Sequence, residues 1–250
     1  MENDVYHQFH AVEEHHWWFR GRRRVLLRVL QALLPPCPGP QPRTVLEVGC
    51  GTGGNLPLLA TLGRVSAMEL DAGARARAQA RGLCEVRSGH LPDAVPFHTT
   101  FDLVCALDVV EHVADDVAAL RALADRLAPQ GRLLVTVPAY GFLWSQHDVR
   151  NHHHRRYTRG QLLRAMAQAG LRVHYASYFN CWLFPAALAS RGLQRLLRRP
   201  LGDELALPHP AINRLLERVL ASEGALLPRI RLPFGLSVVA VATRPAPPTA

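Results

Sequence analysis

The amino-acid sequence predicts an α/β fold, a doubly wound and mostly parallel sheet of seven strands. Short apolar runs alternate with amphipathic helical stretches over residues 43–179, which is the pattern of repeated strand–helix units. A glycine-rich turn follows the first apolar run directly, as in sheets that bind a ligand at the carboxyl ends of their strands. We expect one domain spanning all 250 residues, which is long enough to bury a sizeable core.

The N-terminal part is expected to form a helical cover over residues 1–34. Helical periodicity dominates from about residue 11 to residue 34, and the stretch "PPCPGPQPR" then ends it, because prolines cannot continue a helix.

Six of the seven expected strands lie in residues 43–179, and residues 236–244 supply the last one. A helix with acidic residues at its start, "DDVAALRALADRLAPQG", separates the fourth run from the fifth, and "RGQLLRAMAQAGLRVHYASYFN" combines a helix with the sixth strand. The other expected strands are "TVLEVG", "RVSAMELD", "CEVRS", "FDLVCALD", "GRLLVTVP" and "LSVVAVATR".

Residues 180–235 interrupt this alternation and are expected to form a helical insertion, either a lid or a dimer surface. They hold two amphipathic stretches. Residues 188–199 could pack on the domain with a solvated face, or contact an anionic membrane or substrate. In the first stretch the apolar side consists of Leu188, Leu193, Leu196 and Leu197, and the opposite side of Arg191, Arg195, Arg198 and Arg199. In the second stretch the apolar side consists of Ile212, Leu215, Leu216, Val219 and Leu220.

Composition argues against a nucleic-acid partner despite a net charge of +9. All 29 basic residues are arginines, which is typical of a GC-rich coding sequence, and they are scattered instead of forming one stripe. The five cysteines contain no CxxC pair, so we expect buried thiols and no zinc ribbon. We find no signal peptide and no apolar run of membrane-spanning length, and expect a cytoplasmic protein.

The stretch "VLEVGCGTGGN" has two interpretations as a cofactor loop, besides that of a turn without any cofactor. Gly49, Gly51 and Gly54 form GxGxxG with Glu69 twenty residues on, as in dinucleotide-binding proteins. Gly49, Gly51 and Gly53 also form GxGxG, and Glu47 lies just before them. A carboxylate beside the loop would repel a pyrophosphate but attract the ammonium and sulfonium of S-adenosylmethionine. The charge argument therefore favours S-adenosylmethionine.

These residues, with "SAMELD", "GHLPDAVPF", "FDLVCALDVVEHV", "HHWWFRGRR" and "HHRRYT", resemble the class I S-adenosylmethionine-dependent methyltransferases, in particular the bacterial type 11 and type 12 groups. The resemblance implies a Rossmann-like methyltransferase fold, S-adenosylmethionine as cofactor, and Glu69 on the ribose hydroxyls. One departure is His90, where the family usually has an aspartate near the adenine. The cofactor-binding residues it implies are Glu47, Gly49, Gly51, Thr52, Gly53, Asn55, Glu69, Leu70, His90, Leu91, Asp108, Trp18 and Arg22.

Two clusters flank this core. The aromatic residues Trp17, Trp18 and Phe19 either dock the first long helix on the domain or bring it over the cofactor, where Arg22 or Arg23 would pair with the methionine carboxylate. After the fourth strand come Asp108, Glu111 and His112, which the fold would place at the cofactor crevice.

The segment "HDVRNHHHRRYT", residues 147–158, follows the fifth strand and should face the same crevice. We expect no metal site, because three adjacent loop histidines cannot all point at one ion. Nucleic-acid contact and a solvated loop are further alternatives. We favour a catalytic loop, since histidine can remove the proton of a hydroxyl acceptor.

In the family resemblance the recurrent histidine of "HHRRYT" falls on His153, which is the expected base. His147 and Asp148 are the other expected catalytic residues, with Asp148 orienting an imidazole. The expected substrate-binding residues are Arg155, Arg156, Tyr157 and His112.

We therefore expect an S-adenosylmethionine-dependent methyltransferase that O-methylates a small hydroxylated molecule, such as a sugar, a glycan or lipid-linked intermediate, or a natural product. The alternatives are a nucleic-acid or protein methyltransferase, and a non-catalytic module that binds S-adenosylmethionine. The expected partner is the acceptor molecule, and a homodimer would fit the insertion.

Overall fold

The computed structural model describes residues 3–36, 39–197 and 205–245. The N-terminal cover contains two helices, α1 (Asn3–Val12) and α2 (Trp17–Leu33). The helical periodicity expected from about residue 11 to residue 34 covers the end of α1, a turn between Val12 and Trp17, and the whole of α2. His16 is the N-cap of α2, since its Nδ1 accepts the backbone N–H of Trp18 at 3.2 Å.

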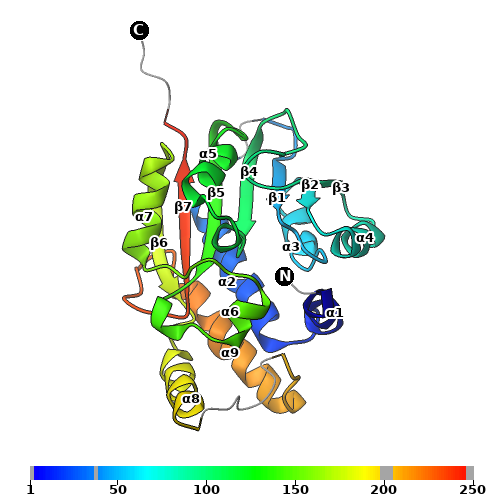
Figure 1. Ribbon diagram of the computed structural model, residues 1–250. Helices are drawn as coiled ribbons and strands as arrows, with labels where there is room; N and C mark the ends of the chain where they lie inside the picture. Colours follow the sequence, from blue (N-terminus) through cyan, green and yellow to red (C-terminus); the bar gives the residue numbers. More distant parts are fainter. Residues whose placement is uncertain (1–2, 37–38, 198–204, 246–250) are drawn as a thin grey trace.

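The described residues contain one seven-stranded sheet in the order β3-β2-β1-β4-β5-β7-β6 (Figure 1). The strands β1 to β5 pair in parallel, whereas β7 lies antiparallel between β5 and β6. The predicted mostly parallel, doubly wound sheet is confirmed, and every predicted run becomes a strand. Their bounds are β1 (Thr44–Val48), β2 (Arg64–Glu69), β3 (Glu85–Ser88), β4 (Phe101–Leu107), β5 (Leu127–Pro138), β6 (Arg172–Phe179) and β7 (Ser237–Thr243).

Helices cover both faces of the sheet, so the strands are apolar on both sides. Alternate residues face opposite cores, as Leu46 and Val45 of β1 do. The first core packs α5 (Asp116–Ala124) and α7 (Arg159–Gln168) against the sheet. The second core packs α2, α3 (Leu56–Ala60), α4 (Ala72–Ala80) and α9 (Pro210–Leu226) against the other face.

Helix α9 of the insertion is fastened to the cover helix α2. Glu217 of α9, which is 3% exposed, forms ion pairs with Arg20 and Arg24 at 2.9 Å each. Gly21 permits close packing, because a Cβ there would lie 2.9 Å from a methyl carbon of Leu220. Helix α9 is thus a packed part of the domain.

The same helix is tied to the end of β6 by a carboxylate. Glu223, fully buried, accepts the backbone N–H groups of Asn180, Cys181 and Trp182 at 2.6–2.9 Å. These bonds fix the start of the insertion.

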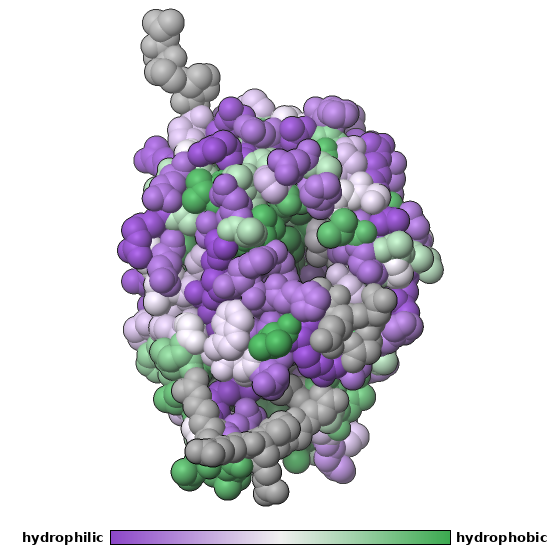
Figure 2. Space-filling model, viewed as in Figure 1, coloured by the Kyte–Doolittle hydropathy of each residue, from purple (hydrophilic) through white to green (hydrophobic). Residues whose placement is uncertain are grey.

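Helix α8 (Phe184–Leu197) exposes its apolar side, with Leu196 79% exposed. Figure 2 shows hydrophobic side chains gathered at this end of the molecule. The expected basic residues Arg198 and Arg199 lie outside the described residues. Within those residues, no helix combines the length and apolar character needed to cross a bilayer.

Three connections meet above the carboxyl ends of the central strands. The glycine loop follows β1, the 3-10 helix η1 (Val110–His112) follows β4, and residues 139–158 follow β5. The last of these contains the 3-10 helix η2 (Gly141–Leu143) and the short helix α6 (Gln146–Arg150). The "HDVRNHHHRRYT" segment therefore begins in a helix and continues as a loop.

Candidate active site

The glycine loop after β1 has a backbone that favours glycine at three positions. Gly49, Gly51 and Gly53 have φ angles of 69°, 55° and 84°, in the left-handed region where a Cβ is strained. At Gly49 a Cβ would also lie 2.7 Å from a methyl carbon of Val109. The loop therefore stays close to η1.

Glu69, at the end of β2, organises this loop. Its two carboxylate oxygens accept the N–H of Gly51 at 2.8 Å and the N–H of Asp71 at 2.9 Å. Helix α1 brings Tyr6 against the same carboxylate, where burial and the nearby charge raise the pKa of the phenol. A carboxylate held in this way is positioned to accept a ribose diol.

Glu47, at 1% exposure, lies below the loop with one unsatisfied oxygen. Asn55 donates to its Oε1 at 3.0 Å, while Oε2 has no hydrogen-bond partner. Burial raises the pKa of Glu47 to about 8. A buried carboxylate with a free oxygen fits an ammonium group, so the residues present suit S-adenosylmethionine.

The cover closes over the loop through Glu13, which the sequence motifs did not predict. Its Oε1 accepts the Thr52 hydroxyl at 2.7 Å and pairs with Arg81 at 2.5 Å. Arg23 of α2 donates to the carbonyls of Glu13 and Gly54 at 2.7 and 3.2 Å. Thr52, an expected cofactor residue, is therefore engaged by the cover.

Arg22, expected to pair with the methionine carboxylate of the cofactor, has partners inside the protein in this structure. It is 4% exposed, and its Nη2 donates to Asp108 and to Thr136 at 2.8 Å each. The ring centroids of Trp18 and Phe19 lie 4.8 Å apart, and the guanidinium carbon of Arg22 lies 5.3 Å from the Trp18 ring centroid. In this structure Arg22 links the cover to the ends of β4 and β5, and Trp18 shields that link.

The expected adenine side is more open. Leu70 is 65% exposed, and Leu91 packs on the edge of the first core. His90 is exposed, but its backbone exchanges two 3.0 Å hydrogen bonds with Ala94. The family resemblance implies that the adenine would lie beside this turn.

The histidine segment contains a buried triad of Asp148, His153 and Arg156. Asp148 is 0% exposed and accepts Arg156 in a bidentate pair, at 2.7 and 3.0 Å. Its Oδ1 also lies 2.8 Å from His153 Nδ1, and its Oδ2 accepts the N–H of Ser145 at 2.8 Å. These hydrogen bonds outweigh burial and hold the pKa of Asp148 well below its usual range.

Because the ionised Asp148 can only accept, His153 Nδ1 is the donor of this hydrogen bond, and in the neutral imidazole the lone pair is then on Nε2. His147, on α6, lies 6.2 Å from His153 between ring centroids. The structure thus brings together the three expected catalytic residues, with Asp148 in direct contact with His153.

The expected substrate residues Arg156 and Tyr157 instead have partners inside the protein. Arg156 pairs with Asp148, and its side chain is 9% exposed. Tyr157, 3% exposed, donates to Asp116 at 2.8 Å. Arg155 pairs with Asp116 at 3.0 Å and donates to the carbonyl of Ala114. Arg155 and Tyr157 thereby fasten the segment to the start of α5.

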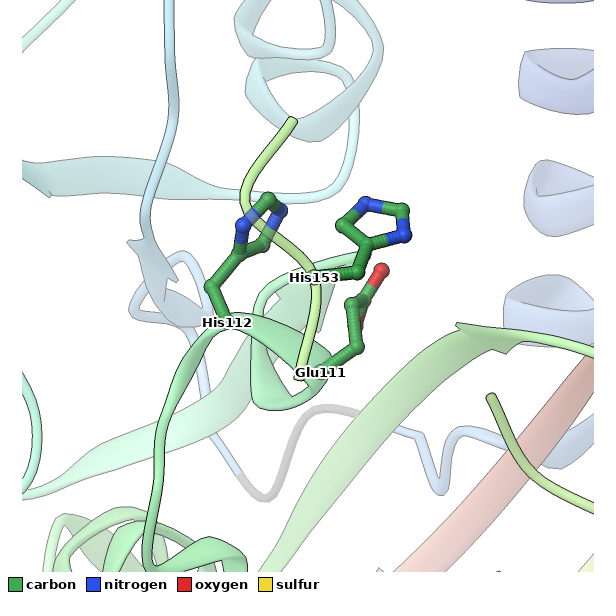
Figure 3. Close-up of side chains that lie close together, drawn as sticks. All are labelled: Glu111, His112 and His153. Atoms are coloured by element: carbon green, nitrogen blue, oxygen red, sulfur yellow. The ribbon is translucent and has the colours of Figure 1, made fainter. Parts of the chain in front are cut away.

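Glu111 and His112 of η1 face the same segment (Figure 3). The N–H of His154 donates to the Glu111 carbonyl at 2.8 Å, and the His112 and His153 rings lie 4.6 Å apart in an edge arrangement. Burial lowers the pKa of His112 to about 4 and raises that of the Glu111 carboxyl well above its usual value. Glu111, His112, Asp148, His153 and Arg156 form what we call the histidine cluster.

Comparison with known proteins agrees with this geometry. The model of a family described as a methyltransferase domain matches residues 18–176. A "Probable S-adenosylmethionine-dependent methyltransferase" of Mycobacterium tuberculosis is 35% identical over 124 residues, covering 49% of this chain and 43% of that protein. A similarly named protein of Mycolicibacterium smegmatis is 32% identical over 130 residues, covering 51% and 48%. The chain spans about half the length of these curated relatives.

Solved structures share the fold. The geranyl diphosphate C-methyltransferase of Streptomyces coelicolor superposes with a TM-score of 0.58 at 17% identity, covering 88% of this chain and 78% of that one. A TehB-like S-adenosylmethionine-dependent methyltransferase of Corynebacterium glutamicum gives 0.52 at 19% identity, with 88% of each chain covered. Taken with the glycine loop, Glu69 and the strand order, these matches show that the chain belongs to the class I S-adenosylmethionine-dependent methyltransferases.

Proposed function

We propose that this methyltransferase transfers the methyl group of S-adenosylmethionine to a hydroxyl oxygen of a small molecule, such as a sugar, a lipid-linked glycan intermediate or a natural product. The observation that carries the proposal is the Asp148–His153 contact of 2.8 Å, which leaves the Nε2 lone pair of His153 free to accept a proton. A hydroxyl acceptor requires such a base, because its oxygen must lose a proton as it gains the methyl group.

The step needs no acid for the leaving group. The acceptor oxygen attacks the methyl carbon, the carbon–sulfur bond breaks, and its electrons stay on sulfur as neutral S-adenosylhomocysteine. The hydroxyl proton passes to His153 Nε2. Asp148 stabilises the imidazolium that forms, as a buried carboxylate does in other histidine-based sites. The rest of the protein's task is alignment of the two reactants.

The arginines near the site favour a small acceptor over a nucleic acid. Arg22, Arg81, Arg155 and Arg156 each pair with a carboxylate of the protein at 2.5–3.0 Å. A polyanion would have to compete with these carboxylates for each arginine, which weakens the electrostatic attraction that nucleic-acid binding depends on.

The proposal is tested by incubating the protein with S-adenosylmethionine and a panel of hydroxylated sugars, glycolipids and phenols. Release of S-adenosylhomocysteine, together with a product whose new methyl group is on oxygen by NMR, is the expected result. Transfer only to nitrogen or carbon acceptors, or to RNA or protein substrates, would contradict it.

A further inference from the structure

Glu111 is a buried group that methyl transfer leaves unexplained. The residue is 0% exposed, and neither of its carboxylate oxygens has a hydrogen-bond partner among the described residues. Leaving a buried carboxyl without a partner is costly, so such a group calls for an explanation, such as a bound ligand or ion. The two arginines whose charges act on this carboxyl, Arg22 and Arg156, are paired with Asp108 and Asp148.

The unpartnered carboxylate is directed at two imidazoles. Ligand atoms of Glu111, His112 and His153 all lie within 4.8 Å of one another. In Figure 3 the Glu111 carboxylate points to the ring of His153, and the ring of His112 lies beside it. The bond from His154 N to the Glu111 carbonyl holds the two segments together at this point.

His153 has the arrangement that metal-ligating histidines usually have. Its Nδ1 lies 2.8 Å from Asp148, and both oxygens of Asp148 also accept from Arg156. A carboxylate on one ring nitrogen fixes the tautomer and turns the other nitrogen toward an ion. Asp148 is therefore in the position of a supporting residue, and Nε2 in that of a ligand.

We propose that Glu111, His112 and His153 bind one divalent transition-metal ion through a carboxylate oxygen and two imidazole nitrogens. Two imidazoles and one carboxylate suit Zn²⁺, Co²⁺ or Fe²⁺, whereas Mg²⁺ and Ca²⁺ prefer oxygen ligands. Tetrahedral bonds of about 2.0–2.2 Å put two ligands of one ion about 3.3–3.6 Å apart, so side-chain movements of about an ångström close the set. The three ligands leave a coordination position open.

The consequence for activity rests on the proposed function. A metal ion bound to His153 takes the Nε2 lone pair that would accept the hydroxyl proton. Occupancy of this site therefore inhibits methyl transfer, and removal of the ion restores it. Metal binding itself does not depend on that proposal, and the two can be tested apart.

The first test is direct. The full chain, stripped with a chelator and dialysed, is titrated with Co²⁺ while the visible absorption of the bound ion is recorded, and Zn²⁺ is then added to displace it. We expect one Co²⁺ per chain, with a low coordination number in the spectrum. Glu111→Gln, which keeps the shape of the side chain, should lose this spectrum, and Asp148→Asn should weaken binding by about 10–100-fold.

His154→Ala is the matched control, because His154 is an exposed neighbour outside the cluster. It should bind Co²⁺ like the wild type, and binding of S-adenosylhomocysteine should show that every variant is folded. Equal Co²⁺ binding by the wild type and Glu111→Gln would overturn the site, as would no binding by the wild type.

The second test measures turnover over the same range of Zn²⁺ concentration. We expect inhibition that follows occupancy and is reversed by chelator. Unchanged or increased turnover with the site occupied would overturn the inhibition and also contradict His153 as the base, while the Co²⁺ result would still decide whether the metal site exists.

Discussion

The expected cofactor edge (Glu47, the loop of Gly49 to Gly53, and Glu69) and the histidine cluster lie at the same edge of the sheet and are built in different ways. In the cofactor edge a side-chain carboxylate holds backbone N–H groups, as Glu69 at the end of β2 holds those of Gly51 in the loop after β1 and of Asp71. In the histidine cluster, side chains after β4 meet side chains after β5. The first part can therefore be disturbed without the second, and the second without the first.

The largest expected effect comes from the histidine cluster. His153→Ala should lower kcat by about 10²–10⁴, the usual contribution of a positioned general base. Affinity for S-adenosylhomocysteine should stay within about twofold by calorimetry, because the cofactor edge contains no group of the cluster. Exposed His154 again provides the control, since His154→Ala should keep wild-type kcat. Equal loss of cofactor affinity and turnover in His153→Ala would mean that the two regions are not separate.

Stability should depend on the buried carboxylate of the cluster. Asp148→Asn leaves the Arg156 guanidinium, 9% exposed, without its ionic partner, and should destabilise the fold by about 3–5 kcal/mol in urea. The double variant Asp148→Asn/Arg156→Met removes both charges and should recover much of that loss, with kcat still low. A single variant as stable as the wild type would contradict the strength of the pair.

The pH dependence of this stability has a definite sign. The pKa of Asp148 is lowered in the folded protein, so its contribution is complete above about pH 4 and is lost as the pH falls further. The difference in free energy of unfolding between the wild type and Asp148→Asn, measured in urea, should therefore shrink as the pH falls below about 4.

The cofactor edge should respond in affinity. Glu69→Ala removes two charged acceptors from a ribose diol, each worth about 1.5–3 kcal/mol, and should weaken binding of S-adenosylmethionine by at least tenfold. Glu69→Gln keeps one acceptor oxygen for Gly51, so its affinity for S-adenosylmethionine should lie between those of the wild type and Glu69→Ala. An unchanged dissociation constant for Glu69→Ala would separate this residue from the cofactor.

The smallest effect is a proton linked to cofactor binding. Glu47 has a pKa of about 8 in the free protein, so most molecules carry its proton at neutral pH. If the cofactor ammonium lies beside it, binding expels this proton, and affinity should rise by up to about tenfold per pH unit toward pH 8. Calorimetry in two buffers of different ionisation enthalpy measures the release, and Glu47→Gln should abolish it. Identical heats in both buffers would place the ammonium elsewhere.

The sequence predicted the fold and the cofactor edge better than the histidine cluster, because the cluster depends on contacts between residues far apart in the chain. The seven strands could be predicted, and the loop glycines, Glu47 and Glu69 could be proposed for the cofactor, because they lie within short stretches whose periodicity or spacing is visible in one dimension. The helical cover was predicted without its division into α1 and α2, since the helical periodicity from about residue 11 continues across the turn between them. Glu13 was also missed, because its contact with Thr52 depends on how the cover folds back.

In the histidine cluster the sequence indicated residue types better than their roles. Arg156 and Tyr157 were expected to bind substrate, but charge and aromaticity do not reveal that Asp148 and Asp116 already hold them. A metal was not expected, because adjacent histidines cannot share an ion. In the structure a single member of that run, His153, meets Glu111 and His112 from another connection, and no spacing rule joins residues 111 and 153.

The central claim, that His153 accepts the acceptor's proton, is tested most directly by the pH dependence of kcat in metal-free buffer. Wild-type kcat should fall on the acid side, because a protonated imidazole has no lone pair for the hydroxyl proton. The much slower His153→Ala variant should lack this acidic decline, and chelator should leave both profiles unchanged. The same acidic decline in wild type and variant would contradict the claim, because some other group would then be the base.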